Sequence, residues 1–214
     1  MLNSPLKTFS RDEILEMDRF FRTTFMNSVS GFKSLNLCGT ISKEGITNLP
    51  VFNSIVHIGA NPPYLGMIFR PHTVPRHTLE NIKETQYYTL NHVNQEIYTA
   101  AHQTSARFPE EQSEFEAAGL TPMQQKFPAP YVAEANIRMG LKFQESHQIL
   151  NETILVIGSV EEVQVPENVI GKDGYIDLAQ AGSLTVAGLD AYHTATLIDR
   201  LSYAKPDRDP ETLL

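Results

Sequence analysis

The segment from residue 48 to residue 91 places the strongest constraint on the fold of this 214-residue chain. An apolar stretch over residues 51–59 runs into a Pro-Pro pair, and a second apolar stretch follows over residues 64–70. Two apolar stretches separated by such turn residues are typical of paired strands. A polar loop comes next and opens a helix that we expect from Thr78 to Thr85. The segment therefore predicts a strand pair that leads directly into a helix start.

Strands dominate the rest of the prediction. Ser10 and Glu13 form a capping-box pattern followed by apolar residues at helical spacing, so we expect one amphipathic helix in an N-terminal arm at about residues 1–28. Gly158 is expected to mark a bend or bulge within one long strand. We expect the polar tail at about residues 205–214 to be loose. The remaining strands are expected at residues 34–41, 87–93, from 137, 154–165, 184–187 and from 192, with short helices at 95–103 and 109–118.

This pattern predicts a mainly β fold. Six or seven strands with a few inserted helices favour one barrel-like β domain over residues 1–214. A wound βαβ sheet fits less well because helices do not alternate with strands. We find no internal repeat and no low-complexity linker.

Composition restricts the partners. The formal net charge is -8, and no run of Lys and Arg offsets it, so nucleic acids and anionic membranes are not expected partners. No apolar stretch is long enough for a transmembrane helix, and the N-terminus lacks a signal-peptide core. Cys38 is the single cysteine, which excludes an intramolecular disulfide and favours a small buried side chain. Together these features predict a cytoplasmic protein.

The loop before the predicted helix carries groups suited to a phosphate. Arg70 and Arg76 supply positive charge, Thr78 supplies a hydroxyl, and His77 lies beside it. A helix start adds backbone N–H groups and a favourable dipole. The alternative is that both arginines are solvated surface residues and that Thr78 only caps the helix.

Two other polar positions could contact a flat, hydrogen-bonding ligand. Asn53 and Ser54 interrupt an apolar strand, which suits a ring with one polar and one apolar edge. Simple alternation would instead point both side chains to solvent. Ser105 lies in a polar cluster between two predicted helices, where a backbone-capping role is about equally well supported.

Other routes to catalysis find little support in the sequence. It contains no Gly-rich phosphate fingerprint of the Rossmann or Walker type and no nucleophile-elbow pattern. The single cysteine and the histidine spacing do not match a zinc site. We therefore predict no catalytic acid–base residue and no metal site.

A series of short motifs follows one another along the chain. They are Asn61-Pro62-Pro63, Thr78 to Ile82, Tyr88 to Asn91, Ser105 to Thr121, Ala129-Pro130 with Glu134-Ala135, His147 with Ile157 to Val160, and Gly188 to Tyr192. No single motif is specific, but their order over residues 25–205 resembles that of the flavin reductase-like family of FMN-binding split barrels.

The resemblance implies a split β-barrel of Greek-key type with peripheral helices. It implies bound FMN, hydride transfer from NADH or NADPH to the flavin, and a homodimer with the flavin near the subunit interface. The phenylalanine-rich N-terminal helix offers apolar surface for such a dimer. The residues implied are Asn48, Asn53 and Ser54 at the flavin ring, Arg70, Arg76, His77 and Thr78 at the phosphate, Asn91 and Ser105 at further cofactor contacts, and His147 at the nicotinamide.

Three functions follow in order of support. The first is an NAD(P)H-dependent flavin reductase or a related FMN oxidoreductase. The second is an FMN-binding electron carrier or sensor that does not use a nicotinamide. The third is a β-barrel binding module without flavin, which the phosphate-loop residues make less favourable.

Overall fold

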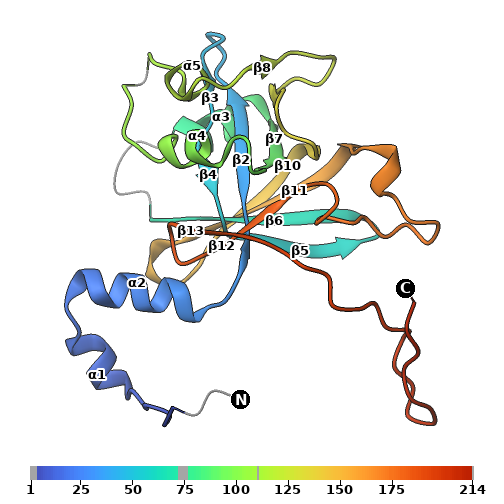
Figure 1. Cartoon of the computed structure of the whole chain (residues 1–214). Helices are drawn as coiled ribbons and strands as arrows, with labels where there is room; N and C mark the ends of the chain where they lie inside the picture. Colours follow the sequence, from blue (N-terminus) through green and yellow to red (C-terminus); the bar gives the residue numbers. More distant parts are fainter. Residues whose placement is uncertain (1–3, 72–76, 110, 214) are drawn as a thin grey trace.

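The computed structural model describes residues 4–71, 77–109 and 111–213. Most of the described strands belong to one large antiparallel sheet that curls through the centre of the molecule (Figure 1). Its strands follow the order β3 (Thr47–Asn48), β2 (Asn36–Ile41), β7 (Tyr87–His92), β10 (Arg138–Gln148), β11 (Ile154–Gln164), β6 (Pro63–Phe69) and β5 (Ile55–Ala60), with β4 (Val51–Phe52) paired to β2. The expected mainly β architecture is therefore confirmed, and the strands of this sheet pair antiparallel.

Two smaller sheets and five α-helices surround this sheet among the described residues (Figure 1). The smaller sheets join β1 (Lys33–Ser34), β12 (Leu184–Ala187) and β13 (Ala191–Thr194), and β8 (Pro122–Met123) and β9 (Tyr131–Val132). The helices are α1 (Arg11–Glu16), α2 (Arg19–Val29), α3 (His77–Thr85), α4 (Tyr98–Gln103) and α5 (Glu114–Ala118), with short 3-10 turns at Leu150–Glu152 and Glu167–Val169.

Apolar side chains on the two faces of β2 belong to two separate cores, with Leu37 in one and Cys38 in the other. On one face, α3 buries Leu79 and Ile82 in a cluster that includes Cys38 and Phe69. On the other face, α4 and α5 contribute to a second cluster that includes Phe115. Cys38 is fully buried and its burial raises the pKa of the thiol, so it is the small buried side chain that the sequence predicts. The helix α3 thus contributes to the core that contains Cys38 and Phe69.

The strand pair predicted from the central segment is present, with one correction. β5 and β6 pair antiparallel, with Ile55 opposite Met67, and α3 follows as predicted. The strand predicted over residues 51–59 is divided into β4 and β5, because β4 pairs with β2 whereas β5 pairs with β6. Asn53 and Ser54 lie at this division, where the chain changes partner strands.

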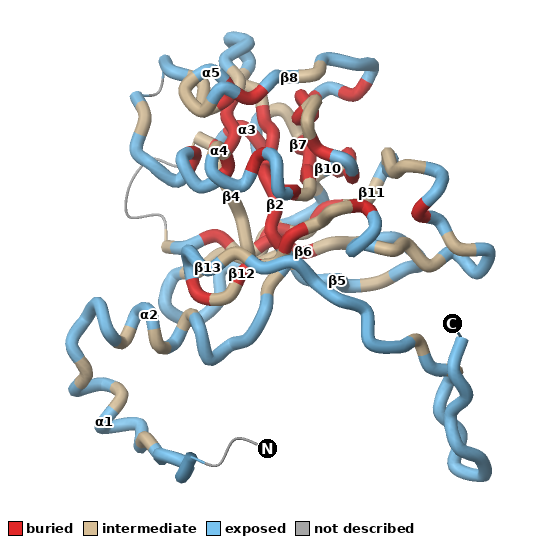
Figure 2. Tube along the Cα trace, in the orientation of Figure 1, coloured by how far each residue is buried: buried red, intermediate tan, exposed pale blue. Residues whose placement is uncertain are grey.

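The N-terminal arm forms two helices instead of the one predicted. The capping box of Ser10 and Glu13 is present and starts α1. Asp18 starts α2, because its carboxylate accepts hydrogen bonds from the backbone N–H groups of Phe20 and Phe21 at 2.9 and 3.1 Å. Neither helix contains a buried residue, and the arm extends away from the sheet (Figure 2).

The C-terminal tail also leaves the body of the protein. It departs after β13, earlier than predicted, and it runs out below the sheet at the right of the view, whereas the N-terminal arm lies below the sheet at the left (Figure 1). Ser202 N donates to Glu211 O at 2.8 Å and Leu213 N donates to Arg200 O at 2.7 Å, so the tail turns back on itself.

Gly158 lies within one continuous strand, β11, as predicted, but for a different reason. The register irregularities lie beside it, at Glu161 on β11 and at Gln144 on β10. A Cβ atom at Gly158 would collide with the hydroxyl of Tyr88. The glycine therefore makes room for a buried ring and is not itself a bulge.

The helices α4 and α5 begin later than predicted. Asn94 Oδ1 accepts hydrogen bonds from Glu96 N and Ile97 N, and this turn occupies residues that the sequence assigned to α4. α5 ends at Gly119, which adopts a left-handed φ of 69°, as the glycine predicts. Among the described residues, every helix is too short or too polar to cross a bilayer.

Candidate functional site

The candidate site lies where the end of β6, the start of α3 and the segment from β3 to β5 meet. Ile68 N on β6 donates to the carbonyl O of Ser54 at 3.0 Å, so the residue before β5 lies beside the C-terminal end of β6, just before Arg70. Thr78 Oγ1 in the first turn of α3 donates to Asn48 Oδ1 on β3 at 2.6 Å. These two bonds hold the segment from Asn48 to Ser54, which is polar only at its ends, against both the strand end and the helix start.

Asn48 and Thr78 are buried, with 9% and 6% of their surface exposed, and their polar atoms contact the protein. Asn48 Nδ2 donates to both carboxylate oxygens of Glu114, at 2.8 and 2.9 Å. Because Thr78 Oγ1 donates its only proton to Asn48, the hydroxyl is committed within the protein. Of the groups predicted to serve a phosphate at this position, the hydroxyl proton of Thr78 is therefore already used within the protein.

Three polar side chains on one face of α3 fix its orientation. They lie three residues apart, at Thr78, Asn81 and Glu84. Asn81 Nδ2 donates to Thr40 Oγ1 on β2 at 3.1 Å, next to the Thr78–Asn48 bond, because Thr40 pairs with Asn48 in the sheet. The apolar residues of the helix face the core instead. The helix start is thus held against the hairpin formed by β2 and β3.

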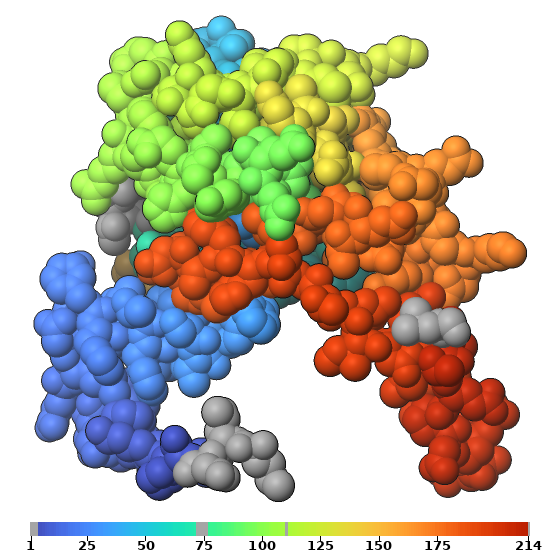
Figure 3. All heavy atoms as spheres, in the orientation of Figure 1, coloured from blue at the N-terminus to red at the C-terminus, as the bar shows by residue number. Residues whose placement is uncertain are grey.

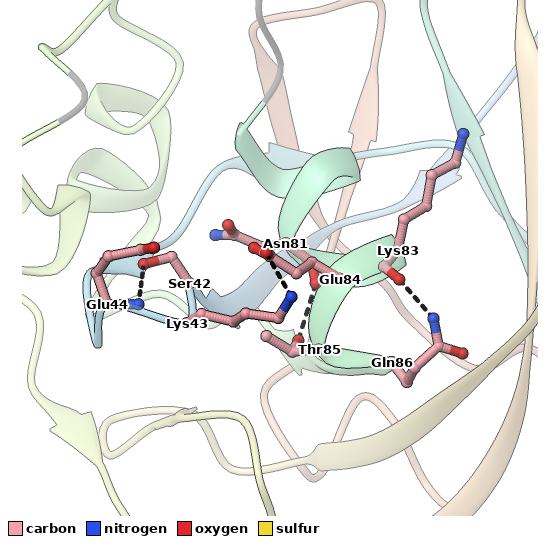
Figure 4. Close-up of polar contacts among 8 residues, drawn as sticks. All are labelled: Ser42, Lys43, Glu44, Asn81, Lys83, Glu84, Thr85 and Gln86. Carbon is pink, nitrogen blue, oxygen red and sulfur yellow. Dashed lines mark hydrogen bonds and ion pairs between the residues drawn. The ribbon is translucent and has the colours of Figure 1, made fainter.

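The last turn of α3 completes this attachment at the tip of the same hairpin (Figure 4). Lys43 Nζ lies 2.8 Å from Glu84 Oε1, and Ser42 Oγ accepts a hydrogen bond from Glu44 N within the turn. The side chain of Lys83 points away from this network, and only its carbonyl is used, by Gln86 Nε2 at 2.5 Å (Figure 4). Lys83 is therefore an exposed cation with no part in positioning the helix.

Arg70 and His77 flank the segment that contains Arg76. Arg76 falls outside the described residues, so its predicted role stays a prediction. The Arg70 side chain is exposed, and no hydrogen bond or ion pair joins it to the part of the chain that the structure describes. His77 is half-buried and is the first residue of α3. A guanidinium and an imidazole thus lie at the two ends of the loop that precedes the helix.

Asn53 and Ser54 are half-buried and retain hydrogen-bonding capacity. Asn53 Nδ2 makes a long contact of 3.5 Å with Gly188 O, and Ser54 Oγ donates to Asn53 Oδ1 at 3.2 Å. One amide N–H of Asn53 and the lone pairs of Ser54 are not used in these contacts. Both side chains can therefore serve a polar ligand edge.

Asn91 and Ser105 occupy contrasting places. Asn91 is fully buried: its Nδ2 donates to Leu37 O at 3.1 Å and to Thr89 Oγ1 at 2.9 Å, and its Oδ1 accepts from Val132 N. This is a structural role that links β2, β7 and β9. Ser105 is exposed just after α4. Neither side chain belongs to the group formed by Asn48, Asn53, Ser54 and Thr78.

His147 lies on the same sheet face as Ser54. The register pairs His147 with Leu155 and Leu155 with Ile68, and Ile68 contacts Ser54 across the next strand. Residues directly opposite one another in antiparallel strands share a face, so three strand spacings of about 4.8 Å put His147 roughly 14 Å from Ser54. His147 is exposed, and its Nε2 lies 3.1 Å from Glu145 Oε1. One extended ligand could reach both positions, but one functional group could not.

Two ionisable side chains with shifted pKa values belong to the core rather than to the site. Burial raises the pKa of Tyr88, whose hydroxyl has no hydrogen-bond partner among the described residues. Burial lowers the pKa of His92 to about 4, and its Nδ1 lies 2.8 Å from Ser183 Oγ. Both groups are therefore neutral at neutral pH. Among the described residues, no cluster of His, Cys, Asp and Glu could hold a metal ion.

Sequence reasoning missed several residues that organise the site. Glu114 and Asn81 position the β3 segment and α3, and Lys43 secures the end of that helix. The repeat of polar residues every three positions on α3 could have indicated a hydrogen-bonded face. The contact of Glu114 gives no such local signal, because it joins residues 66 apart in the sequence.

Comparison with known families gives a match over most of the chain. The model of the flavin reductase like domain matches residues 34–184. A curated protein of Aquifex aeolicus (strain VF5), which has no assigned function, is 33% identical over 138 residues, covering 60% of this chain and 69% of that protein.

Comparison with solved structures supports the same fold. A candidate flavin reductase with a split barrel domain from Shewanella frigidimarina NCIMB 400 is 47% identical, with a TM-score of 0.89 over 92% of this chain and 100% of that chain. Nitrilotriacetate monooxygenase component B from Bacillus cereus is 20% identical, with a TM-score of 0.79 over 92% of this chain and 100% of that chain. The second likeness concerns the fold alone. The split-barrel fold predicted from the sequence is therefore confirmed.

Proposed function

The chain belongs to the flavin reductase-like family, and from this premise we propose that it is an FMN-binding oxidoreductase that transfers hydride from NADH or NADPH to the flavin. One observation carries the proposal. The hydrogen bonds Thr78–Asn48 and Ile68–Ser54 hold a segment with polar residues at both ends between the start of α3 and the end of β6. A phosphate end and a ring end of one ligand could thus be served by adjacent elements.

The residues present fit a flavin with one terminal phosphate. Arg70 is exposed and unpaired among the described residues, and His77 begins a nine-residue helix whose start favours an anion. Asn53 and Ser54 have unused donor and acceptor capacity for a polar ring edge. Arg70, Arg76, His77 and the backbone at Thr78 would hold the phosphate, and Asn53 and Ser54 would hold the ring.

When bound, the flavin would supply the two-electron redox chemistry, with the nicotinamide as the hydride donor. The protein would need to orient the two molecules and to keep one ring face open. No general acid or base is required for such a transfer, and the neutral side chains of Tyr88 and His92 lie in the core. His147 shares the Ser54 face and would contact the nicotinamide at the far end of that face.

Anaerobic titration tests this function. Purified protein is loaded with FMN and then mixed with NADH or NADPH, and the flavin absorbance is followed. Loss of the oxidised-flavin absorbance would support a reductase. Reduction by dithionite but by neither nicotinamide would instead identify an electron-transfer protein or sensor. A parallel titration with FAD should give weaker binding than FMN, because the site is proposed to hold one terminal phosphate.

We also propose that the protein acts as a homodimer. No residue of α1 or α2 is buried, and Phe20 and Phe21 are 77% and 58% exposed. Helices of this length are not stable on their own in water, so the arm needs a surface to pack against. The C-terminal tail exposes 95% of Ile198 and 90% of Tyr203 in the same way. The arm and the tail enclose an open space beside the barrel, which a second copy would fill (Figure 3).

A further inference from the structure

A carboxylate on α5 reaches back to the candidate flavin site. Glu114 Oε1 and Oε2 accept hydrogen bonds from Asn48 Nδ2 at 2.8 and 2.9 Å, and Oε2 also accepts from Leu49 N at 2.9 Å. Glu114 is half-buried, so these bonds are partly shielded from water. A carboxylate offers acceptors only, and both donor nitrogens that it meets, Asn48 Nδ2 and Leu49 N, come from the β3 segment.

This arrangement fixes the direction of every hydrogen bond that follows. Because Glu114 only accepts, the Asn48 amide must turn its Nδ2 toward Glu114 and its Oδ1 toward Thr78. Thr78 must then donate its proton to Asn48, at 2.6 Å. The relay Glu114–Asn48–Thr78 therefore sets both the position and the hydrogen-bond polarity of the first turn of α3.

Holding α5 in place does not require this carboxylate. Phe115 and Leu120 are 1% and 5% exposed and anchor the α5 segment in the core. Thr47 Oγ1 and Ser113 Oγ are 2.6 Å apart and supply a neutral link between β3 and the start of α5. What Glu114 adds is the orientation of Asn48.

We infer that Glu114 is a positioning residue for flavin binding, which acts through Asn48 on the phosphate end of the site. This inference rests on the proposed flavin function. It predicts that a change at Glu114 weakens the binding of FMN more than the binding of riboflavin, which has the same ring but no phosphate. A purely structural role would weaken both ligands alike.

The matched variants move the carboxylate from residue 114 to residue 48, the two partners of one hydrogen bond. In Glu114→Gln the amide oxygen can still accept from Leu49 N, but the amide nitrogen then lies against the donor Asn48 Nδ2, unless the Asn48 amide turns over and reverses its bond to Thr78. Asn48→Asp alone sets two carboxylates against each other. The double variant restores every bond: the introduced glutamine donates to the introduced aspartate and accepts from Leu49 N, Thr78 still donates, and the net charge is unchanged. Glu116→Gln, on the exposed side of α5, is the control.

The experiment measures dissociation constants for FMN and riboflavin by fluorescence quenching, together with the melting temperature of each flavin-free variant. For Glu114→Gln we expect the FMN constant to rise by about tenfold and the riboflavin constant by less than about threefold, with the double variant returning to within about threefold of wild type. Glu116→Gln should match wild type.

Three results would overturn the inference. One is wild-type FMN affinity in Glu114→Gln, another is an equal loss for FMN and riboflavin, and the third is a double variant that folds but binds FMN as weakly as the single variants. If Glu114→Gln alone does not fold, the double variant tests the inference: FMN affinity close to wild type supports it, and a loss of FMN affinity overturns it. A wild-type protein that binds no flavin would refute the proposed function itself, whereas normal wild-type binding with an unaffected Glu114→Gln refutes only the role of Glu114.

Discussion

The hydroxyl of Tyr88 on β7 lies directly against Gly158 on β11, where any Cβ atom would collide with it. The Tyr88 ring is 1% exposed, so it has little freedom to move aside, and its Cζ would lie 2.9 Å from that Cβ. We expect Gly158→Ala to lower the free energy of unfolding by about 1–3 kcal/mol through overpacking. Urea denaturation measures this directly.

Tyr88→Phe supplies the matched control for that prediction. The Tyr88 hydroxyl is buried without a hydrogen-bond partner among the described residues, so its removal alone should change stability by less than about 1 kcal/mol. In the double variant with Gly158→Ala, the atom nearest the new methyl group is absent, and part of the lost stability should return. Equal destabilisation by Gly158→Ala in both backgrounds would show that the hydroxyl is not the obstacle.

The pKa of His92 predicts a specific loss of stability in acid. Burial lowers this pKa to about 4, compared with about 6.5 in an unfolded chain. The unfolded state therefore binds more protons between these values, and stability falls as the pH decreases through this window. The shift corresponds to at most about 3 kcal/mol once the pH is below the folded pKa.

His92→Asn tests this pH dependence, because an amide can retain the contact with Ser183 but does not titrate. Free energies of unfolding at about pH 7.5, pH 6 and pH 4.5 should decline more steeply for wild type than for the variant. The difference between the two slopes isolates His92 from the carboxylates that also titrate in acid. Parallel slopes would contradict the prediction.

The local parts of the fold could be read from the sequence, and the parts set by distant pairing could not. The β5–β6 pair and α3 were predictable because their turn residues, periodicity and caps lie within the elements themselves. The division of residues 51–59 into β4 and β5 depends on which strands each half pairs with, and no local pattern carries that information. The second helix start, at Asp18, was not predicted, because the apolar spacing continues across it.

The candidate site shows the same division. Asn53 and Ser54 were found because polar residues interrupt an apolar stretch, and the structure leaves both with unused hydrogen-bonding capacity. Asn91 also lies in an apolar strand, yet its partners on β2 and β9 satisfy it entirely within the protein. Whether a polar residue in a strand serves a ligand or a neighbouring backbone depends on which element lies opposite, and that is a property of the folded chain.

Arg70 should contribute to flavin binding, whereas Lys83 should not. Arg70 is exposed at the end of β6, whereas Lys83 is in the last turn of α3 and points away from the Lys43–Glu84 network (Figure 4). We expect Arg70→Ala to weaken FMN binding by about tenfold through the loss of a charge-assisted hydrogen bond, and Lys83→Ala to have little effect. Both substitutions remove one positive charge, so a general electrostatic effect would appear in both. Equal affinities in the two variants would exclude Arg70 as a phosphate ligand.

The proposed homodimer predicts that the N-terminal arm contributes to assembly. Wild-type protein at micromolar concentration should show the mass of a dimer in light scattering. Replacement of both exposed rings, Phe20→Ser with Phe21→Ser, should shift the mass toward the monomer. Leu150→Ser, at a residue that is 91% exposed in the turn between β10 and β11 and lies outside the arm, is a control for the loss of surface apolarity. A wild-type monomer that binds FMN would rule out the dimer as a requirement for the site.

The placement of His147 on the Ser54 face predicts its effect on catalysis. If a nicotinamide lies along this face, His147→Ala should slow the anaerobic reduction of bound flavin by about three- to tenfold through poorer positioning and leave FMN affinity nearly unchanged. The neighbouring variant Gln148→Ala is the control, since alternation along β10 points that side chain to the other face. The rate of reduction should change little near neutral pH, because hydride passes directly between the two bound molecules.

Stopped-flow absorbance gives the reduction rate as a function of nicotinamide concentration. A positioning role requires the effect to be confined to the reduction step, so a matching loss in FMN affinity, or the same rate in both variants, would place His147 outside the nicotinamide site.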